Sequence, residues 1–289
     1  MEPEALAARL PPLLLAAERV ASTVAQGVHG RRRAGQGDSF WQFRQLMPGE
    51  SATRIDWRQS ARSMRAFVRE HEWEAAQTAV LWRDASASMA WRSSDSLPFK
   101  RDRAELLLLA LGVLLMRGGE HVRLAGDPRR TARTGRPDAE RLARDLAHLP
   151  ADAPPLPDAD ALPAHGSLVM FGDFLSPLPE IERLFATLAA RPLRCHLVQV
   201  LDPAEQALPY RGRVRFTGLE GEQETLVPDA EAVRTAYRDA FEHHQEGLRG
   251  LCGAARFTLH RHDTDRPPMN TLLALHQALN ISAAAGRHP

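Results

Sequence analysis

Short apolar segments alternate with longer segments of helical periodicity along most of the chain, and this alternation restricts the fold more than any other feature. It predicts strands at residues 77–83, 121–125, 167–171, 194–201 and 256–262, helices at 99–117, 138–148, 178–190, 229–249 and 269–281, and a hairpin at 211–219 and 223–227. Parallel strands need crossover connections, so this order favours a mostly parallel sheet with helices on both faces. The sequence therefore predicts a doubly wound α/β fold of the Rossmann type over residues 76–289.

The first 75 residues follow a different pattern. Apolar residues at helical spacing predict an amphipathic helix over residues 3–28. We expect an interruption near Pro11 and Pro12, because proline removes a helical hydrogen bond. Residues 1–36 are assigned to this helix and to a following loop rich in Gly and Arg.

Residues 37–75 combine arginine, acidic and aromatic residues in short segments. They predict a small β-rich extension in which Phe40 and Trp57 serve as apolar anchors. The extension is expected to pack on the α/β body, because it is too short and too charged to bury a core alone.

Composition narrows the class of protein. Hydrophobic residues make up 44% of the 289 residues and charged residues 25%, which is typical of a globular chain with a proper core. The net charge of +1 provides no overall field that would attract nucleic acid or membrane. The apolar runs reach about half of the roughly 20 residues that a membrane-spanning helix needs, and the acidic N-terminus does not resemble a secretory signal. We therefore expect a cytoplasmic protein without a membrane span.

An acidic residue and two hydroxyls stand at alternate positions after the predicted strand 77–83. Asp84, Ser86 and Ser88 offer three oxygen ligands on one turn, and hard cations such as Mg²⁺ or Mn²⁺ prefer oxygen. The alternative is structural, since Asp and Ser are also common turn and N-cap residues.

A second acidic residue, Asp173, follows the predicted strand 167–171. In doubly wound sheets ligands bind at the carboxyl ends of strands, where the strand order reverses. If the two strands are neighbours there, Asp84 and Asp173 face one crevice. The alternative role for Asp173 is the N-cap of the next helix.

The residues between positions 44 and 74 form a further pattern. It comprises Arg44, Pro48-Gly49-Glu50, Arg54-Ile55-Asp56-Trp57, Ala61-Arg62 and Arg69-Glu70, followed by a strand and Asp-x-Ser-x-Ser-Met. Over residues 36–90, and more weakly to about residue 200, the chain resembles the bacterial family called domain of unknown function 58. It departs from that family at Ser51, where a second acid is usual, and at Arg83, where the strand is usually apolar.

The resemblance implies a von Willebrand factor A-like domain with a metal-ion-dependent adhesion site. Its metal ligands would be Asp84, Ser86, Ser88 and Asp173, with either Thr131 or Thr134 from a middle loop. The family-signature residues would be Arg44, Pro48, Gly49, Arg54, Asp56, Trp57, Arg62, Arg69 and Glu70. The resemblance also implies a partner, because such proteins are often encoded beside MoxR-type AAA+ ATPases and are thought to act with them in protein assembly or maturation.

These observations predict a non-enzymatic protein-interaction domain that uses Mg²⁺ or Mn²⁺ to bind a carboxylate of a partner protein. The sequence contains no Gly-x-Ser-x-Gly elbow and no phosphate-binding loop. One alternative is a metal-dependent hydrolase of the phosphoesterase kind, and a weaker one is an RNA-binding module that uses Arg31, Arg32 and Arg33.

Overall fold

The chain divides into two compact units, residues 28–76 and a larger unit made of residues 1–27 and 77–289. The computed structural model describes residues 3–29, 40–45, 55, 57–61, 66–71, 78–126, 138–150, 153–219 and 224–285.

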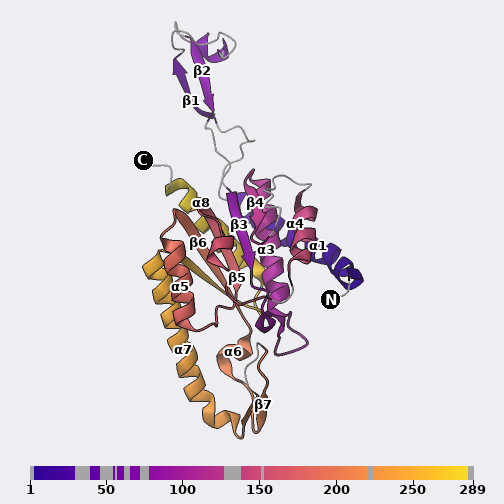
Figure 1. The fold of residues 1–289 in the computed structure, drawn as a ribbon. Helices are drawn as coiled ribbons and strands as arrows, with labels where there is room; N and C mark the ends of the chain where they lie inside the picture. The colour runs from indigo at the N-terminus through magenta and orange to yellow at the C-terminus, as the bar shows by residue number, and fades with distance from the viewer. Residues whose placement is uncertain are drawn as a thin grey trace. The chain divides into compact units, whose positions relative to one another are not determined.

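A parallel sheet forms the centre of the larger unit (Figure 1). Its described strands are β3 (Thr78–Arg83), β4 (His121–Leu124), β5 (Gly166–Gly172), β6 (Leu193–Leu201) and β9 (Thr258–Asp263), in the order β4-β3-β5-β6-β9. When these strands are numbered along the chain, the order is 2-1-3-4-5, so it reverses between β3 and β5. The predicted doubly wound fold is confirmed.

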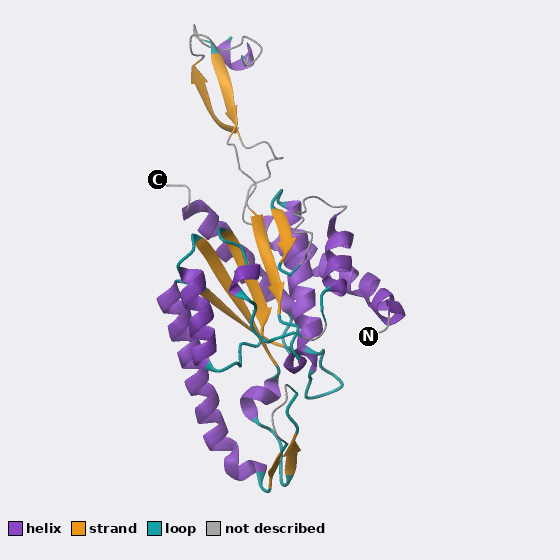
Figure 2. Ribbon diagram, viewed as in Figure 1, coloured by secondary structure: helices purple, strands orange, loops and turns teal. Residues whose placement is uncertain are grey.

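Helices cover both faces of this sheet (Figure 2). They are α3 (Lys100–Arg117), α4 (Asp138–His148), α5 (Leu178–Ala189), α7 (Ala230–Ala255) and α8 (Pro268–Ala285). On one face, Phe185 of α5 and Leu248 of α7 pack in one core with Leu168 of β5 and Leu197 of β6. On the other face, α3 contacts β3, β5, β6, α4 and α8. This position between layers explains why the residues from Leu107 to Leu111 are all 0% exposed.

The N-terminal helix α1 (Pro3–His29) is continuous, so the predicted interruption at Pro11 and Pro12 is wrong. Proline fixes φ near the helical value, and the helix loses only the hydrogen bonds that these two residues cannot donate. The second half of α1 buries Ala17 and Ala21, and Arg117 Nη1 of α3 donates to Ser22 Oγ at 3.0 Å. Those contacts hold the helix on the larger unit.

The smaller unit contains an antiparallel pair, β1 (Phe40–Gln45) and β2 (Phe67–His71), and the one-turn helix α2 (Trp57–Ser60). In the register Arg44 lies opposite Val68, and Arg69 lies opposite Phe43, while Glu70 lies opposite Gln42. Within the smaller unit taken by itself Trp57 is 69% exposed, so two strands and one helical turn do not bury this indole as an anchor. The signature residues Pro48, Gly49, Arg54, Asp56 and Arg62 lie outside the described residues. The packing of residues 37–75 on the body stays a prediction.

The connection between β6 and α7 forms a small insertion. It contains the short helix α6 (Pro203–Ala207) and the antiparallel strands β7 (Val214–Phe216) and β8 (Thr225–Val227), which confirms the predicted hairpin. In Figure 1 the insertion lies beyond one end of the sheet, next to the first turns of α7. Among the described helices, none is long and apolar enough to cross a membrane.

The charged strand residue Arg83 is neutralised within the fold. Its Nη1 lies 3.2 Å from Glu105 Oε1 of α3, and its Nη2 donates to the Pro150 carbonyl at 3.1 Å. Successive strand side chains point to opposite faces, so this guanidinium is directed away from the side taken by the next residue, Asp84.

Replacing Glu105 with Ala should lower the free energy of unfolding by about 3–5 kcal/mol, because the Arg83 guanidinium would stay buried without that carboxylate. Urea unfolding measures the change. Arg141→Ala is the control, because Arg141 pairs with Asp138 on the surface, where a pair contributes about 0–1 kcal/mol. Equal losses in the two variants would contradict the argument.

Candidate functional site

Three neighbouring strands of the sheet each lead directly into an aspartate. Asp84 follows β3, Asp173 follows β5 and Asp202 follows β6, and their exposed fractions are 1%, 2% and 0%. Because β3 pairs with β5 in parallel, Asp84 and Asp173 follow their strands at the same edge of the sheet, where the strand order reverses. The condition that these two strands are neighbours is therefore met, and the convergence of the two carboxylates on one crevice stays a prediction.

The segment after β3, here called the serine loop (residues 84–91), is shaped by its own side chains. Asp84 Oδ1 accepts the Ser86 backbone N–H at 2.8 Å, and the Asp84 backbone N–H donates to the Phe171 carbonyl of β5 at 2.8 Å. Ser86 then precedes the 3₁₀ turn η2 (Ala87–Ala90), but its hydroxyl makes no capping bond there. The Asp84 carboxylate therefore does stabilise a turn, which is the alternative role given above. The Ser86 hydroxyl does not cap the 3₁₀ turn and contacts the Ser88 hydroxyl instead.

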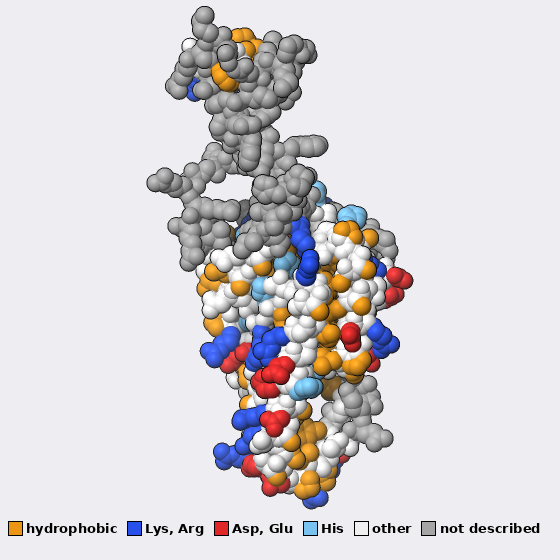
Figure 3. Space-filling view, turned by 90° about the vertical axis from the view of Figure 1, so that its left-hand side faces the viewer, with side chains coloured by type: hydrophobic (Ala, Val, Ile, Leu, Met, Phe, Trp, Pro, Cys, Tyr) orange, Lys and Arg blue, Asp and Glu red, His pale blue; other side chains and the backbone are white. Residues whose placement is uncertain are grey.

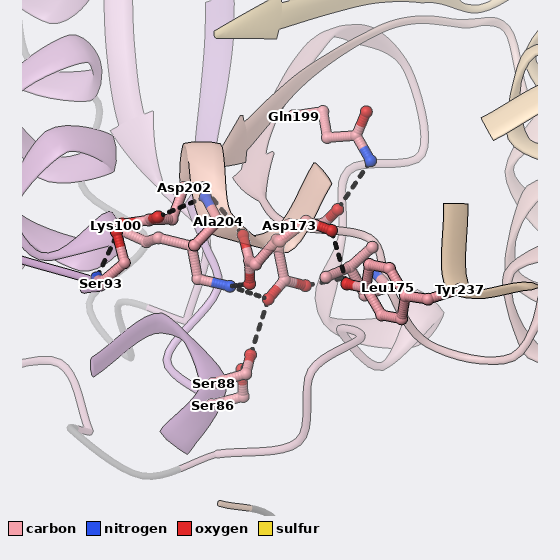
Figure 4. Close-up of polar contacts among 11 residues, drawn as sticks. Ser86, Ser88, Ser93, Lys100, Asp173, Leu175, Gln199, Asp202, Ala204 and Tyr237 are labelled. Atoms are coloured by element: carbon pink, nitrogen blue, oxygen red, sulfur yellow. Dashed lines mark hydrogen bonds and ion pairs between the residues drawn. The ribbon is translucent and has the colours of Figure 1, made fainter. Parts of the chain in front are cut away.

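The two serine hydroxyls and Asp173 form a chain of polar contacts (Figure 4). Ser86 Oγ and Ser88 Oγ are 3.0 Å apart, and Ser88 Oγ donates to Asp173 Oδ2 at 2.7 Å. Asp173 Oδ1 accepts the Leu175 N–H at 3.2 Å. The N-cap of α5 is Pro177, so the alternative N-cap role of Asp173 is wrong.

A lysine that sequence reasoning did not select lies at the centre of this chain of contacts. Lys100 Nζ, at the start of α3, donates to Asp173 Oδ2 at 2.8 Å and also to Glu205 Oε1. Lys100 is 1% exposed. The same carboxylate oxygen therefore receives a serine hydroxyl and an ammonium.

Glu205 is held in place by the first turn of α6. Its Oε2 accepts the Asp202 N–H at 2.8 Å, while Asp202 Oδ1 accepts the Ala204 N–H at 2.9 Å, which completes a capping box. Asp202 Oδ2 also accepts the Ser93 N–H at 2.9 Å. The end of β6 is thereby joined to the segment that follows the serine loop.

Comparison with known proteins agrees with the signature pattern. A family model described as "Protein of unknown function DUF58" matches residues 42–247. The chain belongs to the DUF58 family. Uncharacterized proteins of Mycobacterium tuberculosis and Mycobacterium bovis are each 28% identical to this DUF58 chain over 298 residues, covering 97% of it and 92% of the relative. A crystal structure of the conserved hypothetical protein BatB from Bacteroides thetaiotaomicron covers 73% of the chain and 100% of its own, with 11% identity and a TM-score of 0.39.

Buried charge shifts the pKa values in the DUF58 site. Burial lowers the pKa of Lys100, but the carboxylates of Asp173 and Glu205 raise it more, so the net shift is upward and the side chain is an ammonium at neutral pH. Burial also raises the pKa of Glu205, and Lys100 lowers it only in part. One ammonium therefore does not fully compensate the acids around it.

The oxygen set at this edge fits a hard divalent cation. Two hydroxyls, of Ser86 and Ser88, converge with the carboxylate of Asp173, and such ligands suit Mg²⁺ and Mn²⁺. In the part of the chain that the structure describes, no cluster of three or more His, Cys, Asp or Glu side chains could hold a metal, so a cation here would need the serine hydroxyls. The loop threonines Thr131 and Thr134 lie outside the described residues.

The two residues that flank Asp173 allow little change in side chain or backbone conformation. A Cβ added to Gly172 would lie 3.0 Å from Asp84 Cβ, so a larger residue there would displace that side chain. Phe174, directly after Asp173, has a φ of 51°, and its carbonyl contacts His244 Nε2 at 2.8 Å. Non-glycine residues in this region are strained, and such strain is common at functional sites.

Sequence reasoning missed Lys100, Asp202 and Glu205. A signal for the first was present, because Lys100 is the only lysine among 37 basic residues. Lysine carries a compact ammonium and arginine a larger planar guanidinium, so a single lysine among arginines marks a position where the two are not interchangeable. The signal for the other two was the pattern Asp-Pro-x-Glu after a strand, a capping sequence.

Replacing Lys100 with Met should lower the free energy of unfolding at pH 7 by about 3–5 kcal/mol, because Asp173 and Glu205 would remain buried without the ammonium. The penalty should shrink between pH 7 and pH 5. Without Lys100 the folded pKa of Glu205 moves further above its unfolded value, so the folded variant takes up a proton first and gains stability as the pH falls. Denaturant titrations at several pH values measure both effects.

Arg141→Met, at an exposed position of α4, is the control for Lys100→Met and should change stability by less than about 1 kcal/mol, because Arg141 makes only a surface pair with Asp138. A Lys100→Met penalty that grew on acidification would contradict the charge argument.

Proposed function

We propose that this chain is a protein-interaction domain that binds Mg²⁺ or Mn²⁺ at the carboxyl end of its sheet and through that ion binds a carboxylate of a partner protein. The proposal rests on the chain of contacts in which Ser88 Oγ lies 3.0 Å from Ser86 Oγ and 2.7 Å from Asp173 Oδ2. It is the arrangement that the resemblance to von Willebrand A-like adhesion sites predicts.

The residues of this site would have different roles toward the ion. Ser86, Ser88 and Asp173 would hold the ion, and Asp84 would fix the loop through the Ser86 N–H while adding negative charge. A bound divalent ion supplies an electrophilic position for an added carboxylate. Lys100 would keep Asp173 oriented toward Ser88 whether or not the ion is bound.

Formal charge supports a divalent ion. Asp84, Asp173, Asp202 and Glu205 carry four negative charges and Lys100 carries one positive charge, which leaves three negative charges, four minus one, in a largely buried group. An ion of charge +2 would offset most of this excess, and a partner carboxylate could then approach with less repulsion.

We further propose that the chain performs no chemistry of its own, that it acts in the cytoplasm, and that its partner is a MoxR-type AAA+ ATPase working in protein assembly or maturation. Membership of the DUF58 family supports this partner through the family resemblance given above. A metal-dependent phosphoesterase is the main competing function.

Calorimetric titration should show binding of Mg²⁺ or Mn²⁺, and Asp84→Asn should weaken it by at least about 10–100-fold. The amide oxygen of Asn can still accept the Ser86 N–H, so the loop should keep its shape and circular dichroism should not change. Asp160→Ala removes an acid whose side chain is 93% exposed and should leave the affinity unchanged. An unchanged metal affinity in the Asp84→Asn variant would contradict the proposed metal site.

Binding of a purified MoxR-type ATPase should fail with the Asp84→Asn and Ser86→Ala variants at constant Mg²⁺. Variants are preferable to EDTA here, because the ATPase needs Mg²⁺ with its own nucleotide. Metal-dependent turnover of a phosphoester substrate that disappears with Asp84→Asn would instead support the hydrolase alternative.

A further inference from the structure

A cavity of about 820 Å³ opens beside the serine loop, on the side of the α6 and β7–β8 insertion. Its size lies within the usual range for ligand pockets, about 300–1,000 Å³. Ser88, Asp173 and Glu205 line it, so the cavity is continuous with the proposed metal face.

We propose that this cavity receives a large apolar side chain, of the Leu, Phe or Trp class, from the same partner segment whose carboxylate meets the Ser86–Ser88 face. The inference rests on the proposed function and specifies the partner. It describes a recognition segment with one acidic residue and one large apolar residue within a few positions of each other.

The chemistry of the wall points to an apolar occupant. Trp91, Leu208, Tyr210, Phe216 and Leu219 line the cavity, and the rings of Tyr210 and Phe216 meet edge to face at 5.7 Å between centroids. Leu219 is 48% exposed, and Figure 3 shows hydrophobic side chains at the end of the molecule that carries the insertion. Burying a large apolar group strengthens binding by about 10- to 100-fold.

The charges around the cavity restrict the occupant further. Three acids, Asp173, Glu180 and Glu205, line the cavity. The hairpin residue Arg215 also lines it, but its Nε lies 3.0 Å from Glu224 Oε1, so its charge is already paired. A second acidic residue of the partner would therefore be repelled there. An uncharged apolar side chain suits this part, and the single acid of the segment belongs at the metal face.

The wall is fixed before any ligand arrives. Arg234 of α7 donates from Nε to the Leu208 carbonyl at 3.0 Å and from Nη2 to the Tyr210 carbonyl at 2.8 Å. The Gly212 N–H donates to Glu231 Oε2, also on α7, at 2.6 Å. Leu208 has a φ of 44°, a strained value that these contacts maintain. A preformed wall reduces the entropy lost on binding.

The test selects random dodecapeptides displayed on phage against the full chain in Mg²⁺. Enriched peptides should carry Asp or Glu within about four residues of Leu, Phe or Trp. The affinity of one synthetic enriched peptide is then measured by fluorescence anisotropy for two variants. Leu219→Asp places an acid in the cavity wall and should weaken binding about tenfold or more.

Leu226→Asp is the matched control. Leu226 is 45% exposed on β8 of the same hairpin, it does not line the cavity, and the substitution changes the net charge by the same amount. Its affinity for the peptide should stay within twofold of the unsubstituted chain.

Equal weakening by the two variants would overturn the inference. Enrichment of acidic peptides without an apolar neighbour, with Mg²⁺ still bound in calorimetry, would also overturn it and leave the proposed function standing. Peptide binding that is the same in EDTA, in a protein that takes up no Mg²⁺, would overturn the proposed function and this inference with it.

Discussion

The rest of the site depends on the buried ion pairs that the Lys100 ammonium forms with Asp173 and Glu205. This ammonium lies where α3 begins, and it contacts Asp173, the acid that follows β5, and Glu205, the acid in the first turn of α6. An isolated buried ammonium would be very costly, and so would either carboxylate alone. Each group is tolerated in the interior because the others are there, so their three segments must assemble together.

The topology of the sheet explains how so many acids reach one edge. All described strands of the sheet are parallel, so every strand delivers its following residue to the same side. Local bonds then set the direction of each acid: Asp84 and Asp173 accept backbone N–H groups two residues later, and Asp202 does the same within a capping box. Each of these acids is thus buried together with a backbone hydrogen bond, and Ser88 lies in the lining of the neighbouring cavity.

The fold could be predicted because its signals are local. Apolar strands, helical periodicity and the Asp-x-Ser-x-Ser pattern are each read within a few residues. The general rule for doubly wound sheets left the adjacency of β3 and β5 as a condition, which the strand order meets. Lys100 and Glu205 could not be placed in this way, since they lie 73 and 105 positions from their partners Asp173 and Lys100. The error at Pro11 and Pro12 has another origin, because each proline removes only the hydrogen bond that it cannot donate and its φ fits a helix. The exposure of Trp57 follows from the small size of its unit.

The solitary position of Lys100 has a practical consequence for protein chemistry. Amine-reactive reagents attack the unprotonated form, and the only lysine of this chain is 1% exposed and held as an ammonium. Acylation of the lysine would occur only in molecules where the contacts with Asp173 and Glu205 have opened. The acylation rate would therefore report how often the site opens.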